Sequence, residues 1–321
     1  MLYLLYLPVL TFLLLIYFKL SVQFKIIDKP NHRSSHSRIT IRGGGIIFPI
    51  AILLQALFSG FQYPLFTSGL LLIGIVSFYD DMRPLSNKIR LLVHLIAVPL
   101  LFMQADLMSH SVWIIIPVYI LVIGTINAYN FMDGINGITG AYSLITVLSL
   151  FFINEFHISF ALSEWLIVAA LSLLVFIFFN FRRKAKCFAG DVGSVSMAFI
   201  IIFFLLLLII KSGDLKYIGL LLFYGLDAVS TIVFRLIRKE NIFEAHRSHF
   251  YQYLANVKGW PHLGVSAMFV LVQLMVNVLI LSFNWSSASF LIFIVVSGII
   301  FVGLRFAVEG REHLMGRRLA N

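Results

Sequence analysis

The sequence predicts an all-α integral membrane protein with about 11 transmembrane helices, its N-terminus outside the cell and its C-terminus in the cytoplasm. Three observations predict this fold. Of the 321 residues, 60% are hydrophobic and only 12% are charged. Many apolar stretches reach the ~18 residues that suggest a transmembrane helix, and the basic residues are confined to alternate loops. This composition excludes an ordinary soluble domain, so residues 1–321 are expected to form one polytopic membrane domain.

The apolar stretches define the expected spans and the loops between them. We expect spans at residues 1–18, 43–59, 66–79, 90–105, 112–129, 137–153, 163–180, 193–210, 216–234, 262–283 and 287–304. The first span has no basic segment before it and no small-residue cleavage site after it, so a retained helix is expected there. Nearly all residues capable of catalysis lie in the longer loops, 19–42, 80–89, 130–136, 181–192 and 235–261, which share one side of the membrane.

The distribution of positive charge predicts the orientation. Of the 24 Lys and Arg residues, all but Lys211 and Lys216 lie on the side of the longer loops. The positive-inside rule places that side in the cytoplasm. The net charge of +10 therefore reflects topology and contact with anionic membrane lipid, and no nucleic-acid partner is expected. The single cysteine, Cys187, excludes an internal disulfide.

Two adjacent carboxylates, Asp80 and Asp81, end the third span directly after an apolar run. They repel each other, so either a cation compensates for them or the pKa of one of them rises. Both outcomes suit catalysis, as a metal-assisted site or as a general base, and a solvated helix end is the alternative. Lys88 and Arg90 follow at the mouth of the next span, where they could hold the headgroup of an anionic lipid.

A polar residue recurs at every third position after the fifth span, namely Asn127, Asn130, Asp133 and Asn136. On a helical or 3₁₀ turn this spacing predicts one polar ridge. Its carboxamide and carboxylate oxygens would suit a nucleotide base, a ribose or a cation. Capping at a helix C-terminus would explain one Asn and one following Gly, but not four polar residues in register.

The segment Gly190 to Ser194, Gly-Asp-Val-Gly-Ser, opens the eighth span. Asp191 could be an N-cap only. However, helix N-termini attract phosphate, and a carboxylate beside one can bring Mg²⁺ to a diphosphate. Phe188, three residues before the aspartate, could stack on a base.

Three basic or potentially basic side chains, His246, Arg247 and His249, lie within four residues of the 235–261 loop. This density suits phosphate binding. Zinc is the competing ligand, but neither a cysteine partner nor a His-Glu-x-x-His spacing accompanies the histidines, and a solvated basic loop is the plainest alternative. Asp227 lies inside the ninth span.

The first inner loop contains a polar run over residues 28–36 and ends with Arg42 before three glycines, Gly43 to Gly45. The glycines allow a tight helix start or close packing on a neighbour. They do not form a phosphate-binding P-loop, because the Lys and Ser/Thr of that motif are missing.

Taken in order, these segments resemble the polyprenyl-phosphate N-acetylhexosamine-1-phosphate transferases, glycosyltransferase family 4, over roughly residues 28–254. The family's motifs look like Asp80 and Asp81, Asn130 to Gly134, Gly190 to Ser194, and His246 to His249. The sequence His-Arg-Ser-His followed by Tyr251 and Gln252 is more similar to the branch that starts O-antigen and related surface polysaccharides. It is less similar to the peptidoglycan branch, which contains phospho-MurNAc-pentapeptide translocase.

The resemblance implies a reaction. A polyprenyl (undecaprenyl) phosphate attacks the β-phosphate of a UDP-N-acetylhexosamine at the cytoplasmic face of the bacterial inner membrane. The products are polyprenyl-diphosphate-sugar and UMP. Mg²⁺ is the implied cofactor, with Mn²⁺ as an alternative, and a homodimer is implied by the resemblance alone. Direct attack and a covalent aspartyl intermediate both stay open, as does the identity of the N-acetyl sugar.

The resemblance also implies roles for individual residues. The catalytic set is Asp80, Asp81, Asp133 and Asp191, with Asp191 as the Mg²⁺ ligand. Asp80 or Asp81 would deprotonate or orient the lipid phosphate, helped by Lys88 and Arg90. Phe188 would stack on uracil, and the nucleotide pocket would be shaped by Asn127, Asn130, Asp133, Asn136 and Asn180. His246, Arg247 and His249 would bind the diphosphate or the sugar, and Asp227 matches a charged position of the family.

Two departures from the family's pattern stand out. Asn136 occupies a position where the family usually has aspartate, and residues 181–190 lack the family's proline and its Met before Gly-Asp. A membrane transporter, a lipid-phosphate phosphatase and a catalytically altered homologue are the alternatives. A transporter would place charges near the bilayer midplane on broken helices, whereas here Asp227 alone among the acids is expected inside the membrane.

Overall fold

The computed structural model describes residues 2–28, 39–242, 244 and 246–316, and these residues are almost entirely helical. The longer helices are α1 (Tyr6–Gln23), α2 (Ile47–Phe58), α3 (Pro64–Met82), α4 (Asn87–Gln104), α5 (Val112–Met132), α6 (Ile138–Phe156), α7 (Ser163–Asn180), α8 (Gly190–Ser212), α9 (Leu222–Ile237), α11 (His262–Ser282) and α12 (Ser287–Glu309). Two short helices, α10 (Phe250–Gln252) and α13 (Arg311–Met315), and two short strands, β1 (Ile27–Asp28) and β2 (Thr40–Ile41), complete the set used below. Most of the polar run expected at 28–36 lies outside the described residues.

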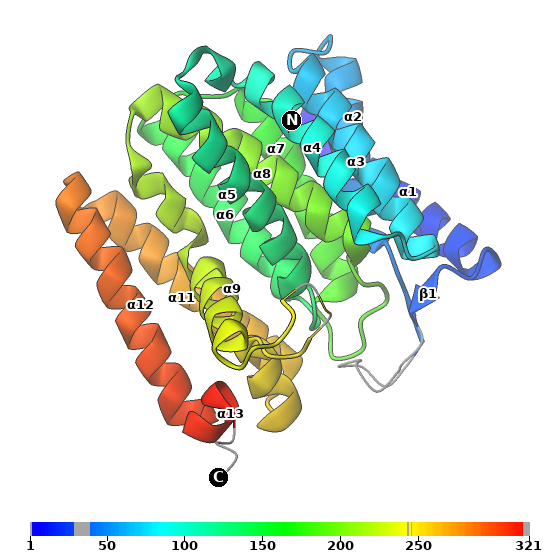
Figure 1. Cartoon of the computed structure of the whole chain (residues 1–321). Coiled ribbons are helices and arrows are strands. Elements are labelled where there is room, and N and C mark those ends of the chain that lie inside the picture. The colour runs from blue at the N-terminus through cyan, green and yellow to red at the C-terminus, as the bar shows by residue number, and fades with distance from the viewer. Residues whose placement is uncertain (1, 29–38, 243, 245, 317–321) are drawn as a thin grey trace.

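Ten helices of the described chain are long and apolar enough to cross a membrane, which confirms the all-α membrane fold. The remaining expected span, 43–59, is the shorter apolar helix Gly44–Phe58, in which a 3₁₀ turn runs into α2. At ~1.5 Å per residue this helix is shorter than the ~30 Å hydrocarbon core of a bilayer. The first helix begins and the last one ends at opposite ends of the bundle (Figure 1), as an odd number of spans requires; which end faces the cytoplasm stays a prediction.

Two helix ends differ from the predicted bounds in a way that matters for the site. α3 runs to Met82, so Asp80 and Asp81 occupy its last turn and not the loop that follows. α5 runs to Met132, three residues beyond the expected end. Both helices continue because polar partners from neighbouring segments meet their last turns, and those partners are distant in sequence.

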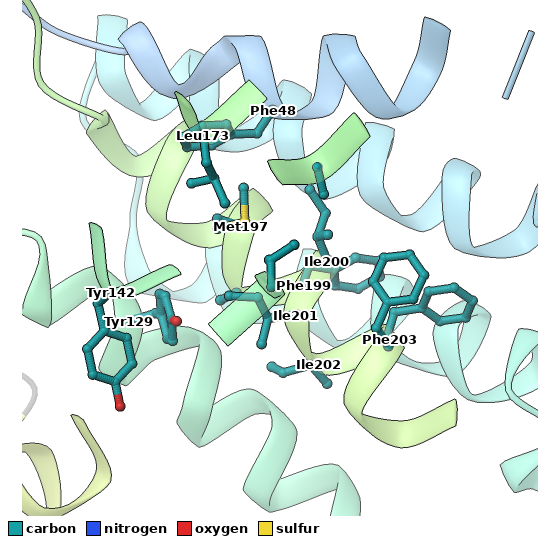
Figure 2. Packing of buried hydrophobic residues seen from close by; sticks show 14 of the residues in the cluster. Phe48, Tyr129, Tyr142, Leu173, Met197, Phe199, Ile200, Ile201, Ile202 and Phe203 are labelled. Carbon is teal, nitrogen blue, oxygen red and sulfur yellow. The ribbon is translucent and has the colours of Figure 1, made fainter. Parts of the chain in front are cut away.

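α8 is the central helix of the bundle. It packs against α2, α3, α5 and α6, and 83% of its most apolar stretch is buried inside the protein. Figure 2 shows Met197 and Phe203 of α8 among buried side chains that include Phe48 of α2 and Leu173 of α7. A helix that is apolar on all sides and surrounded by other helices is a fixed support. The segment at its N-terminus, which contains the Gly-Asp-Val-Gly-Ser motif, is therefore held in place.

The start of α2 lies directly against the start of α8. The N–H of Gly44 donates to the carbonyl of Phe188 (2.8 Å), and the N–H of Gly45 donates to the carbonyl of Ala189 (3.0 Å). A Cβ atom on Gly45 would lie 2.2 Å from the Cα of Gly193, so only glycine allows this approach. The expectation that the three glycines permit close packing on a neighbour is confirmed.

Strands β1 and β2 pair antiparallel, and β2 also bridges to the loop before α8. Ile41 forms an isolated parallel bridge with Cys187, which is buried. The first inner loop and the 181–192 loop are thereby joined at the same end of the bundle as α13 (Figure 1). Burial raises the pKa of the Cys187 thiol, so this cysteine is a packing residue with little thiolate character.

The ninth expected span is broken into a 3₁₀ helix, Leu215–Leu221, and α9. Gln273 of α11 satisfies the backbone at the break: its Oε1 accepts from the N–H of Phe223 (2.9 Å), and its Nε2 donates to the carbonyl of Gly219 (2.9 Å). Inside a membrane protein such groups must find partners within the protein. The break therefore belongs to the scaffold, and α9 continues from it past Asp227 toward the site.

Candidate active site

Asp81 is the buried centre of a polar cluster at the end of α3. Its Oδ1 accepts a hydrogen bond from the N–H of Asp191 (2.9 Å), and its Oδ2 accepts one from the N–H of Val192 (3.0 Å). These N–H groups are free donors at the N-terminus of α8, where the helix dipole favours a negative charge. A Cβ atom on Gly190, whose φ is +72°, would lie 2.5 Å from Asp81 Oδ2. The aspartate pair thus binds the glycine-aspartate motif directly.

Arg42 joins the same two motifs from the first inner loop. Its Nε donates to Asp81 Oδ1 (2.6 Å), and its Nη2 donates to Asp191 Oδ1 (3.2 Å). Burial alone would lower the pKa of Arg42, but the charges of Asp81 and Asp191 outweigh it and raise that pKa. The sequence alone assigns Arg42 no role in the site. The signal that could have found it is its position immediately before the three glycines.

Asp80 and Arg90 complete the cluster. Asp80 Oδ1 accepts from the N–H of Leu85, and Asp80 Oδ2 lies 3.4 Å from Nη1 of Arg90. The same Nη1 lies 3.6 Å from Oδ2 of Asp191. Asp191 is therefore placed between two guanidinium groups, those of Arg90 and Arg42. A compensating cation, one of the two outcomes expected for the aspartate pair, is therefore present in the fold.

The donor set of this cluster fits magnesium. The described residues contain no group of three or more His, Cys, Asp or Glu side chains arranged to hold a metal ion. Mg²⁺ does not need one, because it keeps several waters and binds through one or two carboxylates together with substrate phosphates. The Asp191 side chain is 16% exposed, whereas that of Asp81 is fully buried. Asp191, with Asp80 beside it, is the carboxylate that an entering ion could reach.

Asn130 and Asp133 lie where α5 ends. Asn130 Oδ1 accepts from the hydroxyl of Ser194 (2.7 Å), which ties the Asn-x-x-Asp-Gly motif to α8. Asp133 follows the last residue of α5. Burial, aided by the negative charge of Asp81, raises the pKa of Asp133 to about 6. A carboxyl group with a pKa this close to neutrality is suited to proton transfer.

The predicted ridge of four polar residues is not formed. Asn127 is exposed on α5, and its Nδ2 donates to the carbonyl of Ile123 one turn earlier (2.9 Å). Asn136 lies beyond the end of α5, in a turn that closes at Gly137 with φ +86°. α5 is an α-helix, which turns by about 100° per residue, so side chains three positions apart drift around its axis and do not stack. Asn136 in addition lies outside the helix, because α5 stops at Met132.

Asn136 and Asn180 hold the loop between α7 and α8. The Nδ2 of Asn136 donates to the carbonyls of residues 182 and 183 (2.9 and 3.4 Å). Asn180 Nδ2 donates to the carbonyl of Cys187 (2.8 Å), and its Oδ1 accepts from the N–H of Gly137 (2.8 Å). Both side chains are buried. Their contacts show that they fix the path of the loop leading to the glycine-aspartate motif, and their expected part in shaping the nucleotide pocket stays a prediction.

Phe188 and Lys88 lie at the edge of this cluster. The N–H of Phe188 donates to the carbonyl of Ile41 (2.8 Å), and its carbonyl accepts from Gly44, so its backbone is fixed on both sides. Lys88 is exposed in the first turn of α4, two residues before Arg90. Stacking on uracil and contact with a lipid headgroup stay predictions for these two residues.

Asp227, on the membrane-spanning helix α9, holds the segment His246 to His249 (the histidine segment) and the two residues that follow it. Its Oδ1 accepts from the N–H of Phe250 (2.8 Å), and its Oδ2 accepts from the N–H of Tyr251 (3.2 Å). His249 Nδ1 lies 3.3 Å from Oδ1, and the hydroxyl of Thr231 donates to the same oxygen (3.2 Å). The Asp227 side chain is fully buried. Its contacts therefore support the histidine segment, and a direct contact of Asp227 with a substrate stays a prediction.

The histidine segment keeps polar atoms without partners. Nε2 of His249 and Nε and Nη2 of Arg247 are buried and have no hydrogen-bond partner within the described protein. Buried polar groups without partners cost free energy, and such groups call for a ligand or ordered water. Burial, together with nearby positive charge, lowers the pKa of His246 to about 4, so that imidazole is neutral at pH 7.

Phe131 and Tyr251 connect the histidine segment to the carboxylate cluster. The Tyr251 hydroxyl donates to the carbonyl of Phe131 (2.8 Å) and lies against Gly134, where a Cβ atom would be 2.2 Å away. The ring of Phe131 lies 5.7 Å from that of His246 and 6.4 Å from that of His249. In Figure 1 the yellow segment that contains these histidines lies beside the end of α5. The Asn-x-x-Asp-Gly turn therefore lies between the two groups of residues.

Comparison with known proteins gives the same assignment as the motifs. A family model described as "Glycosyl transferase family 4" matches residues 63–209. A probable undecaprenyl-phosphate N-acetylglucosaminyl 1-phosphate transferase of Bacillus subtilis is 26% identical over 256 residues, 74% of this chain and 71% of the relative. A phospho-N-acetylmuramoyl-pentapeptide-transferase of Dictyoglomus thermophilum is 26% identical over 256 residues, 73% of this chain and 79% of the relative.

A third relative is similar along most of its length. It is an undecaprenyl-phosphate alpha-N-acetylglucosaminyl 1-phosphate transferase of Thermotoga maritima, 30% identical over an alignment of 273 residues, and the match covers 80% of this chain and 82% of the relative. The matched region contains the aspartate pair, the Asn-x-x-Asp-Gly turn and the glycine-aspartate motif that the structure brings together. The chain belongs to glycosyl transferase family 4.

Proposed function

We propose that this protein transfers an N-acetylhexosamine-1-phosphate group from a UDP-sugar to undecaprenyl phosphate. In this reaction a phosphate oxygen of the lipid forms a bond to the β-phosphorus of the UDP-sugar. The bond between that phosphorus and the oxygen bridging to the α-phosphate breaks, and UMP leaves with that oxygen. The names of the relatives from B. subtilis and T. maritima support the acceptor lipid and the transferred group.

One observation carries the proposal: Asp191 lies between Arg42 and Arg90 at the end of the bundle where all the motifs meet. Such a cluster offers carboxylate oxygens to a cation and guanidinium groups to phosphates. In the turns of α4 that follow Arg90, Leu91, Leu92 and Ile96 are exposed, and these apolar side chains suit contact with lipid tails. A lipid phosphate reaching Arg90 along α4 would meet a water-soluble nucleotide sugar there.

Each group in the cluster has a role in this proposal. Bound Mg²⁺ would offset the charge that develops on the diphosphate, with Asp191 and Asp80 as its protein ligands. Asp133, whose pKa is about 6, would accept a proton from the lipid phosphate, and Asp81 would hold α8 in place. Arg247 and His249 have unpaired buried nitrogens, which would bind the diphosphate or the N-acetyl sugar. The same segment would decide which sugar is accepted.

The finer aspects follow the resemblance to the surface-polysaccharide branch. We infer that the active site faces the cytoplasm in the bacterial inner membrane, where the basic loops are expected, and that the product begins O-antigen or a related polysaccharide. A transporter is less well supported, because the broken span is closed by Gln273 and the paired carboxylates gather at one end. A catalytically altered homologue is also less well supported, since Asn136 supports a loop and replaces no carboxylate of the cluster.

A radiolabel in the β-phosphate of the donor tests the proposal. Purified protein is given UDP-N-acetylglucosamine labelled there, with undecaprenyl phosphate and Mg²⁺, and with other UDP-N-acetylhexosamines in parallel. We expect the label to move into the organic phase only when the lipid is present. Label released as inorganic phosphate would indicate a phosphatase instead, and no transfer from any of the donors would contradict the proposal.

A further inference from the structure

The last membrane-spanning helix, α12, contains a buried ion pair that sequence reasoning did not single out. Arg305 is 1% exposed, and its Nε donates to Oε1 of Glu309, one turn later. Charged side chains inside a membrane span are expensive and rare unless they have a task. The signal in the sequence is the spacing itself, an arginine four residues before a glutamate in an otherwise apolar span.

The guanidinium of Arg305 connects α12 to two other segments. Nη1 donates to the hydroxyls of Ser230 (2.9 Å) and Thr231 (2.8 Å) on α9. Nη2 donates to the carbonyl of Ser248, in the middle of the histidine segment (2.8 Å). Only arginine presents donors in a planar fork wide enough for such a set of acceptors.

Arg305 also interacts with Asp227 on α9, both directly and through Thr231. Nη1 lies 4.0 Å from Asp227 Oδ1, and Thr231, which accepts from Arg305, donates to that same oxygen. Asp227 in turn accepts from the N–H groups of Phe250 and Tyr251. A chain of short contacts therefore runs from α12 to the residues that directly follow the histidines.

The short helix after α12 contacts the same region from the far side. Nη1 of Arg238 donates to the carbonyl of Leu314 (2.9 Å), and the ring of His313 lies 4.8 Å from that of Tyr253. The two C-terminal helices thus contact the chain both before and after the histidines. This places α12 and α13 in the frame of the site.

We propose that Arg305 is a positioning residue that fixes the segment His246 to His249 from behind. The inference rests on the proposed function, because that segment is there assigned to the donor substrate. Arg305 is too deeply buried to touch a substrate. Its effect is to hold the Ser248 carbonyl and the Asp227 carboxylate in one arrangement, so that the unpaired nitrogens of Arg247 and His249 stay aimed at a ligand. Glu309 balances the charge of Arg305.

The first test measures hydrogen–deuterium exchange and needs no activity. In Arg305→Lys, amides of residues 246–257 are expected to exchange at least about 10-fold faster, since a lysine cannot reach all the acceptors. Gln55→Ala is the matched control: it removes another buried polar side chain, which accepts from the hydroxyl of Tyr6 (2.9 Å) near the end of α2 that lies away from Gly44 and Gly45. Unchanged exchange at 246–257 in Arg305→Lys, or the same increase in the control, would overturn the proposal. If Arg305→Lys does not fold, Glu309→Gln is measured in its place.

The second test measures kinetics once the wild type is shown to be active. We expect Arg305→Lys to raise KM for the UDP-sugar about 10-fold, the size typical of a lost hydrogen bond to a charged group, with kcat changed by less than about 3-fold. Combined with His249→Ala, it should add little further loss, since both changes act through one segment. Additive effects, or a fall in kcat alone, would overturn the positioning role. An inactive wild type would contradict the proposed function, while the exchange experiment would still decide the role of Arg305.

Discussion

Asp81 and Asp227 each bind two consecutive backbone N–H groups of another segment. Asp81 holds those of Asp191 and Val192, and Asp227 holds those of Phe250 and Tyr251. In both cases the carboxylate is buried and an arginine lies within 4.0 Å. Each carboxylate thus fixes the start of a segment whose side chains remain available for chemistry. These two buried acids are supports, and the groups assigned to the substrates are built on them.

The first prediction concerns Asp81→Asn. An asparagine can accept with one oxygen only, and its amide would oppose either the N–H of Val192 or the guanidinium of Arg42. We expect activity to fall on the order of 100-fold, because displacing a catalytic group by ~1 Å has effects of this size, and the apparent melting temperature to fall as well. Asp214→Asn is the control, since Asp214 makes a similar cap to the N–H of Lys216 (2.9 Å) away from the site. Full activity in Asp81→Asn would refute the supporting role.

The second prediction concerns Arg42→Lys. The guanidinium contacts Asp81 and Asp191 through different nitrogens, and a single ammonium cannot reproduce this geometry. We expect turnover to fall by at least about 10-fold and the Mg²⁺ concentration for half-maximal activity to change. Arg183→Lys, at an exposed position, should leave both quantities unchanged. If Arg42→Lys needs the same Mg²⁺ concentration for half-maximal activity as the wild type, Arg42 does not influence Asp191.

The third prediction concerns Asn136→Asp, which restores the residue that the family usually has. In this chain the Asn136 amide donates to the carbonyls of residues 182 and 183, and a carboxylate would instead repel them. We expect lower thermal stability and about a 10-fold loss of activity, measured by thermal unfolding in detergent and by UMP release. Asn284→Asp, on an exposed loop, controls for the added charge. An activity gain in Asn136→Asp would mean that the position still faces the substrate or metal.

The fourth prediction concerns pH. Burial raises the pKa of Asp133 from 3.8 to about 6, so its carboxyl is protonated below that pH and ionised above it. If the ionised form accepts a proton, activity should fall as the pH drops through 6, by about 10-fold per unit. Because the folded state binds this proton more tightly than the unfolded state, the ionised carboxylate reduces stability as pH rises from about 4 to 6.

Asp133→Asn separates these two effects. It should remove activity, yet raise the apparent melting temperature at pH 7, where the wild type carries the cost of a buried charge. Unfolding curves and initial rates between pH 5 and pH 8 check both statements. Wild-type activity in Asp133→Asn would exclude a role in proton transfer, and lower stability at pH 7 would argue against the raised pKa.

Much of the site could be predicted because its polar residues occur in short motifs within an otherwise apolar chain. Asp80 and Asp81 were expected either to meet a compensating cation or to have one raised pKa, and the cations are present as Arg42 and Arg90. That these residues meet at one end of the bundle followed from the alternation of spans and loops, and the side of the membrane that this end faces stays a prediction. The helices themselves followed from their length and hydropathy.

The rest depended on contacts between segments that are distant in sequence. Asn136 and Asn180 have amide side chains of the kind that bind ligands. Only their contacts with segments distant in sequence show that these amides hold the loop between α7 and α8. Spacing alone could not show that α5 stops at Met132 and leaves Asn136 outside the helix. Arg305 looked like one more juxtamembrane cation, because its partners on α9 and in the histidine segment lie 57 to 75 residues earlier in the chain.

The most direct test of the central claim compares lipid-dependent UMP release by the wild type with that by Asp191→Asn, over a titration of Mg²⁺. Both proteins are purified and shown to be folded by thermal unfolding, and both receive undecaprenyl phosphate and the preferred UDP-N-acetylhexosamine. The wild type should release UMP only when lipid and Mg²⁺ are both present. Asp191→Asn should stay folded and lose that release at every Mg²⁺ concentration. Release by the wild type without lipid, or full release by Asp191→Asn, would contradict the account.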